Sequence, residues 1–269
     1  MPLLVSALLA GVLRFAGRAT MGPRLSAAGV GLGILATYGL AMGVPPLPPV
    51  ISLEKIAYVT AAGLILGVLI DLTRVAPFAR WFAFAALLAA ALYWLAEPRA
   101  DLNHPWRLAG LVALWIIGLV TLWRAEAGRD GGMEPVIKLL VAAIGVGLVA
   151  MIGNADVQAK LAFATAAALV GFLVWNWPQT RYPWNAALLL GAQVTLLGLI
   201  ANLSLFSAAS LPALAILILV FFADVALRHI NLGTSKFARS MHPWVLGALC
   251  LLPVLAAIAV AQLHTSTAG

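Results

Sequence analysis

Residues 210–228 read SLPALAILILVFFADVALR, an apolar run that carries one carboxylate, Asp224, and ends at Arg228. A helix that crosses about 30 Å of hydrocarbon needs about 20 mostly apolar residues. The run has that length and composition, so it predicts a transmembrane helix. Burying an ionisable side chain in a bilayer is costly, so the carboxylate also marks a candidate functional position.

Similar apolar runs, bounded by proline, glycine, asparagine or charged clusters, occur along the whole chain. They cover residues 2–16, 25–44, 56–73, 80–96, 106–123, 135–153, 160–176, 184–203, 210–228 and 243–262. Arg14 makes the first run short, so nine spans is the alternative to ten. We therefore expect an all-α integral membrane protein. It would be a bundle of about ten transmembrane helices with short loops, forming a single membrane domain over residues 1–269.

The composition supports this class and excludes others. Apolar residues make up 64% of the chain and charged residues 9%, and the mean hydropathy is +1.05. Soluble domains are roughly 45–50% apolar and about 25% charged. A soluble enzyme, a nucleic-acid-binding protein and a disordered scaffold are therefore excluded.

The basic residues divide unequally between the predicted loops. Of the sixteen Lys and Arg residues, twelve fall in or beside odd-numbered loops, and the even-numbered loops hold only Lys55, Arg99, Arg107 and Lys160. Cytoplasmic loops are enriched in Lys and Arg, so the odd-numbered loops are predicted to be cytoplasmic. Ten spans would then leave both termini outside. The high Ala, Leu and Gly content fits a bacterial inner-membrane protein.

One short pattern suggests an internal repeat. His104-Pro105-Trp106 opens the fifth predicted helix, and His242-Pro243-Trp244 opens the tenth. A separation of five spans would give two inverted halves, about 1–130 and 131–269, as in many transporters. The alternative is that the pattern recurs without any repeat, because proline is favoured at the first helical position and tryptophan at the membrane interface. Tyr182-Pro183-Trp184 occurs at an offset that breaks the repeat.

Two acidic residues are candidate functional positions. Asp224 lies about 13 residues into its run, or about 20 Å deep, and Arg228 follows one turn later. The two residues form either a neutralising pair or the setting of a protonatable or cation-coupling carboxylate. Asp71 and Arg74 form a similar arrangement at i,i+3 spacing nearer a helix end, where a structural pair is favoured. If their helices were adjacent, the two aspartates would line one cytoplasmic-facing cavity. Asp224 is the one ionisable residue that we place well inside a span.

The run 184–203 is the most polar, and its Gln193 and Asn202 are further candidates. Uncharged polar residues in membrane helices usually bond to neighbouring helices. The alternative is that they line a solute path. Gln193 and Thr195 are two residues apart and therefore do not share a helix face.

Glycine spacing indicates close helix packing. The pairs Gly29/Gly33 and Gly63/Gly67 have the separation that lets two helix backbones approach each other. We interpret both pairs as packing within the chain, with oligomerisation through these faces as the alternative.

The sequence gives little support for catalysis or a cofactor. No histidine lies in mid-span, which argues against haem ligation between helices. The chain has no HExxH motif, glycine-rich phosphate loop or GxSxG elbow. Its single cysteine, Cys250, excludes a disulfide within the chain and a cysteine metal site. We expect no catalytic residue, metal or cofactor, with a lipid-modifying enzyme as the remaining catalytic alternative.

Two functions fit this layout. The first is a small secondary transporter or permease, and the scarcity of charge inside the spans favours an apolar or neutral solute. The second is a non-catalytic membrane subunit that anchors or stabilises a larger complex. The expected surroundings are the lipid bilayer and either other membrane subunits or further copies of the chain, with no nucleic acid.

Overall fold

The computed structural model describes residues 2–16, 22, 25–73, 75–97, 105–127, 132–176, 182–230 and 236–268. It does not describe the side chains of residues 105–107, 127, 236–240, 267 and 268. The described part is all-α, without strands.

Eight of the described helices are long and apolar enough to cross a membrane. They are α4 (Ser52–Thr73), α5 (Pro77–Ala96), α6 (Pro105–Ala127), α7 (Glu134–Ile152), α8 (Asp156–Trp175), the span Ala186–Phe206, the span Leu211–Arg228 and α13 (Lys236–Ala268). The helices α1 (Pro2–Ala16) and α3 (Ala28–Met42) are apolar but shorter. Each predicted run coincides with a helix, so the multi-pass all-α class is confirmed. The number of crossings stays a prediction, because α1 and α3 are short for a full span.

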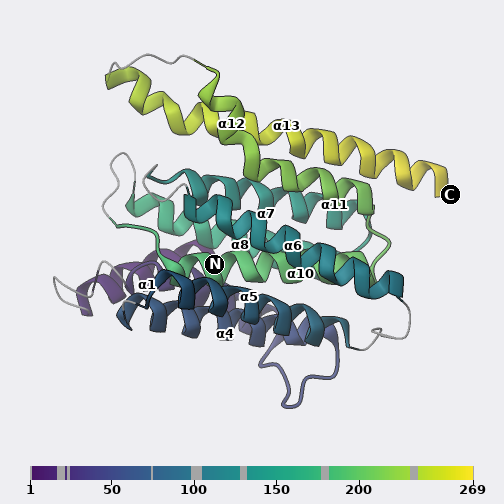
Figure 1. The fold of residues 1–269 in the computed structure, drawn as a ribbon, viewed down its shortest axis with the longest axis horizontal. Coiled ribbons are helices and arrows are strands. Elements are labelled where there is room, and N and C mark those ends of the chain that lie inside the picture. Colours follow the sequence, from purple (N-terminus) through teal and green to yellow (C-terminus); the bar gives the residue numbers. More distant parts are fainter. Residues whose placement is uncertain are drawn as a thin grey trace.

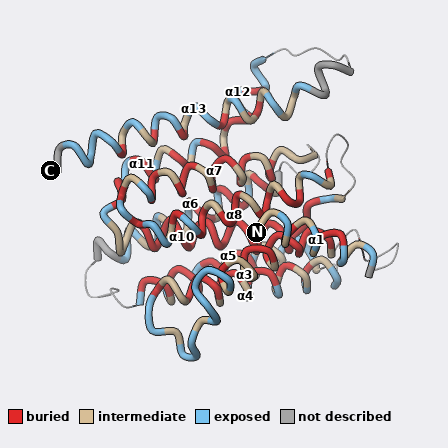
Figure 2. Tube along the Cα trace, turned by 180° about the vertical axis from the view of Figure 1, so that it is seen from behind, coloured by how far each residue is buried: buried red, intermediate tan, exposed pale blue. Residues whose placement is uncertain are grey.

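The helices lie side by side, close to the long axis of the molecule (Figure 1). The most enclosed is Ala186–Phe206, which consists of α9 (Ala186–Leu188), η2 (Leu189–Gln193) and α10 (Val194–Phe206). Its apolar window is entirely buried, whereas that of α6 is 22% buried and that of α13 is 28% buried. Figure 2 accordingly shows much of α13 as exposed. We call Ala186–Phe206 the central span, because α3, α4, α5, α6, α7 and α8 all pack against parts of it.

Two glycines of α4, which have no side chain, let the central span approach α4 closely. A Cβ atom added to Gly63 would lie 2.7 Å from the carbonyl oxygen of Leu190. One added to Gly67 would lie 2.5 Å from the Cα atom of Ala187. Only glycine allows two backbones this near.

The second glycine pair has the same role between α3 and α1. A Cβ atom at Gly29 would lie 2.7 Å from the backbone nitrogen of Ala10, and one at Gly33 would lie 2.8 Å from the Cβ atom of Ser6. The interpretation of both glycine pairs as packing within the chain is therefore confirmed. These faces are occupied and are not free to form an oligomer.

Two spans depart from regular α geometry. The central span contains a π turn, η2, and the span Leu211–Arg228 contains a 3-10 turn, η3 (Ile218–Phe222), between α11 (Leu211–Leu217) and α12 (Ala223–Arg228). Such segments are often found at functional positions in helices. The candidate Gln193 is the last residue of the π turn, and the candidate Asp224 lies two residues after the 3-10 turn.

Candidate functional site

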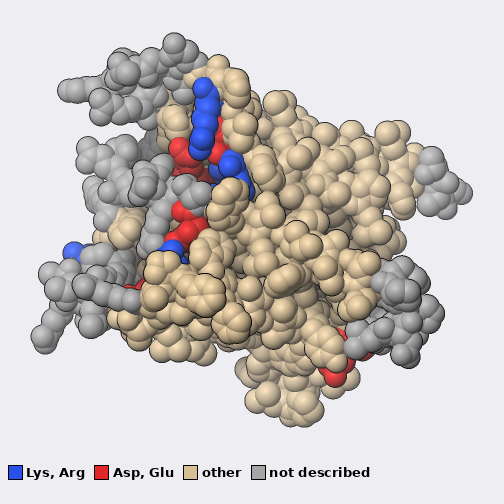
Figure 3. Space-filling model, viewed as in Figure 1, with Lys and Arg blue, Asp and Glu red and all other residues tan. Residues whose placement is uncertain are grey.

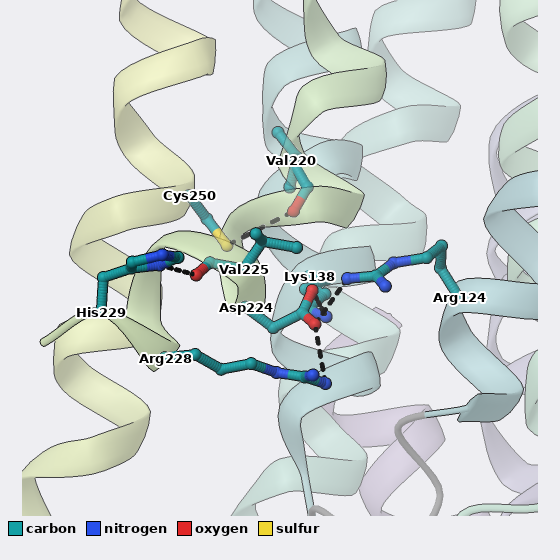
Figure 4. Close-up of polar contacts among 8 residues, drawn as sticks. All are labelled: Arg124, Lys138, Val220, Asp224, Val225, Arg228, His229 and Cys250. Atoms are coloured by element: carbon teal, nitrogen blue, oxygen red, sulfur yellow. Dashed lines mark hydrogen bonds and ion pairs between the residues drawn. The ribbon is translucent and has the colours of Figure 1, made fainter.

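Asp224 lies in the first turn of α12, directly after the 3-10 turn, and its side chain is buried. Its carboxylate joins three helices (Figure 4). Arg124 on α6 donates from Nη2 to Oδ2 at 2.5 Å, and Lys138 on α7 donates from Nζ to Oδ1 at 2.6 Å. One buried carboxylate is therefore matched by two cations from other helices.

Arg228 pairs with Asp224 at the predicted i,i+4 spacing. Its Nη2 atom lies 3.7 Å from Oδ2 of Asp224, and its side chain is 77% exposed. The predicted pair of Asp224 with Arg228 is therefore present, but Arg124 and Lys138 lie nearer to the carboxylate. Spacing along one helix reveals i,i+4 neighbours, but it cannot reveal partners that the fold brings from other helices.

Lys138 also corrects the prediction that Asp224 is the one ionisable residue well inside a span. It lies within α7, and its side chain is 3% exposed. Lys138 interrupts the apolar run 135–153, so the sequence does carry a signal for this residue. Arg124, in the last turn of α6, gives no comparable signal in the sequence.

Further contacts between acidic and basic side chains lie near the same end of the bundle. Arg80 on α5 bonds Glu126 on α6 at 2.8 Å, and Glu134 on α7 lies 3.8 Å from Nε2 of His242 on α13. Together with Asp224 they link α5, α6, α12, α7 and α13. Figure 3 shows Lys and Arg together with Asp and Glu on the left of the view, and a smaller acidic patch at the lower right. We call this group, defined by Arg80, Glu126, Arg124, Asp224, Lys138, Glu134 and His242, the charged end.

Asp71 lies on α4 and has a different role from Asp224. Its two carboxylate oxygens accept hydrogen bonds from the backbone N–H groups of Ala186 and Ala187, at 3.1 and 2.9 Å. The carboxylate thereby caps the free N–H groups at the start of the central span. The predicted partner Arg74 lies outside the described residues.

The expected cavity shared by Asp71 and Asp224 finds no support. Asp71 binds the start of the central span, whereas Asp224 binds α6 and α7. The two carboxylates therefore serve separate contacts.

Gln193 ends the π turn of the central span and is completely buried. Neither its Nε2 nor its Oε1 atom has a hydrogen-bond partner among the described residues. Thr195 instead contacts α4, where its Oγ1 atom lies 2.7 Å from Oγ1 of Thr60. Because Gln193 is about 200° around the helix from Thr195, it points away from that contact.

Asn202, the other candidate in the central span, is paired. Its Oδ1 atom accepts a hydrogen bond from Nε2 of Gln158 on α8, at 3.0 Å. This contact joins two helices, as polar residues in membrane spans usually do. The two amides of the central span therefore differ in hydrogen bonding. Asn202 bonds a residue of a neighbouring helix, and Gln193 bonds none of the described residues.

The described residues bring together no three His, Cys, Asp or Glu side chains that would hold a metal ion. Cys250 is buried, with its Sγ atom 3.8 Å from the carbonyl oxygen of Val220. No model of a known protein family matches the chain, and no curated protein matches it significantly.

Proposed function

We propose that the protein is a small permease of the bacterial inner membrane, with both termini outside, and that it carries a small neutral solute. The observation that carries the proposal is the central span, which is fully enclosed by other helices and yet departs from regular α geometry at a π turn. Single π turns within helices are frequent at functional sites, and irregular backbone is tolerated in a membrane only inside protein or beside a cavity.

The charge distribution supports a neutral solute. The central span, residues 186–206, contains no Asp, Glu, Lys or Arg. The cations of the buried cluster are directed at Asp224, and the charged end lies near the ends of the helices. We infer that the charged end holds the helices together on the cytoplasmic side, while the solute contacts uncharged groups deeper in the bundle.

A flux measurement tests the proposal. The purified protein is reconstituted into liposomes, and vesicle re-swelling is followed by stopped-flow light scattering after a jump in glycerol, urea or acetamide. We expect re-swelling with at least one solute to be faster than in protein-free liposomes. If re-swelling is no faster than in protein-free liposomes for any of the three solutes, a permease for small neutral molecules is contradicted.

The alternative, a membrane subunit of a larger complex, predicts a different composition in the native membrane. Gentle detergent extraction, followed by a native gel and mass spectrometry, would then recover the chain in a stoichiometric assembly with other subunits. A permease predicts a monomer or a small homo-oligomer. The two measurements together separate the two functions.

A further inference from the structure

We propose that the side chain of Gln193 is the hydrogen-bonding group of the solute site, and that the solute is a small neutral molecule of the amide or urea class. This inference rests on the proposed permease function and names its substrate class. It starts from a wholly buried carboxamide whose nitrogen and oxygen both lack a partner among the described residues. A buried polar group without a partner costs free energy, and a ligand that bonds it recovers that cost.

Other buried amides of the described chain are satisfied. Asn202 accepts from Gln158 at 3.0 Å, Asn185 accepts from the backbone nitrogen of Leu188 at 3.3 Å, and Asn176 accepts from that of Tyr182 at 2.7 Å. These three amides bond a neighbouring helix, cap a helix or hold a turn. Gln193 does none of these among the described residues, so packing does not account for its amide.

The position of Gln193 separates it from the charged groups. It lies seven residues into the central span, about 10 Å from the start of that helix. Asp224 lies four residues before the end of its own span, about 6 Å from that end. The amide is thus deeper along its helix than the charge cluster is along its own, in a span without charged residues.

The chemistry of a carboxamide selects the solute class. A primary amide offers two N–H donors and one carbonyl acceptor. A second amide or a urea matches it with two parallel hydrogen bonds, N–H to carbonyl in each direction. A polyol such as glycerol donates and accepts only through hydroxyl groups on freely rotating carbons, so it lacks the planar N–H and carbonyl pair that closes this ring of two bonds. A site that forms two such bonds at once rejects a molecule that lacks one of the groups.

The test compares two identical substitutions in the liposome assay. Gln193→Leu removes the unpartnered amide and keeps an apolar side chain of similar size. Gln158→Leu makes the same change at an amide that bonds Asn202. We expect the wild-type protein to speed urea and acetamide flux but not glycerol flux. Gln193→Leu should lower that flux about tenfold, the effect of losing two neutral hydrogen bonds.

Stability gives an independent readout. Gln193→Leu should not lower the unfolding temperature, because it removes a buried group without a partner, whereas Gln158→Leu should lower it and leave the flux per molecule unchanged. Acetamide should raise the unfolding temperature of the wild type but not of Gln193→Leu. Unfolding is followed by maleimide labelling of the single buried cysteine, Cys250.

The outcomes separate this inference from the permease proposal. Equal urea flux in the wild type and in Gln193→Leu would overturn the amide site and leave the permease standing. Stabilisation by acetamide that depends on Gln193, without any flux, would support the site and overturn the permease. If the protein shows neither solute flux nor stabilisation by acetamide, both the amide site and the permease proposal are overturned.

Discussion

The carboxylate of Asp224 gains its importance from the cations around it. Lys138 is 3% exposed and Arg124 is 15% exposed, so neither can rely fully on water for solvation. Each is held by the same carboxylate, at 2.6 and 2.5 Å. Removing one partner of such a group leaves an uncompensated charge in a poorly solvated place, which costs far more than removing an exposed charge.

We therefore expect Asp224→Asn to lower the free energy of unfolding by about 3–5 kcal/mol, the usual effect of breaking a buried ion pair. The measurement is the rate of Cys250 labelling during heating in detergent. Arg228→Gln is the control, because this exposed side chain lies 3.7 Å from the carboxylate and should contribute roughly 0–1 kcal/mol. Combining Asp224→Asn with Lys138→Met should restore part of the loss. Equal effects of the two single substitutions would contradict the assigned partners.

At the scale of elements, the position of the central span depends on its contact with α4. The contact has two parts, which are the close approach at Gly63 and Gly67 and the cap that Asp71 provides to Ala186 and Ala187. Gly67 and Asp71 act at the start of the span, before the π turn, whereas Gly63 approaches Leu190 inside that turn. The same packing thus brings α4 close to the start of the span that carries Gln193.

Substitution of Gly67 tests that packing. A Cβ atom there would lie 2.5 Å from the Cα atom of Ala187 and 2.6 Å from the carbonyl oxygen of Ala186, and both are backbone atoms. Gly67→Ala should therefore destabilise the fold by about 1–3 kcal/mol, as overpacking does. Gly39→Ala is the matched control, because a Cβ atom there meets nothing within 4 Å. It should be neutral or should stabilise by up to about 1 kcal/mol, and unfolding temperatures that do not differ would contradict the close contact.

At the scale of the whole molecule, the uneven distribution of basic residues predicts the orientation in the membrane. The described part of the C-terminal helix ends away from the charged end (Figures 1 and 3). If the charged end faces the cytoplasm, as the enrichment of Lys and Arg in odd-numbered loops predicts, the C-terminus faces outward.

Cysteine accessibility checks this orientation. In a Cys250→Ser background, Thr265→Cys should react with a membrane-impermeant maleimide added to intact cells or spheroplasts. Ala76→Cys, in the exposed connection between α4 and α5, should react only after the membrane is opened. Both positions are exposed, so burial does not explain a difference. The reverse labelling pattern would invert the predicted topology.

The sequence alone determined the class of the protein and the places of its helices. The apolar runs are set by bilayer thickness and by the need of every backbone N–H and C=O group to bond within its own helix, and both conditions can be read locally. The tertiary structure decided the partners. Arg124 and Lys138 lie 100 and 86 residues from Asp224, and Asp71 caps a helix that starts 115 residues later. The same packing left Gln193 without a partner among the described residues while it gave one to Asn202. Hydropathy scores each side chain against the bilayer, whereas the pairing of polar groups depends on which helix faces meet.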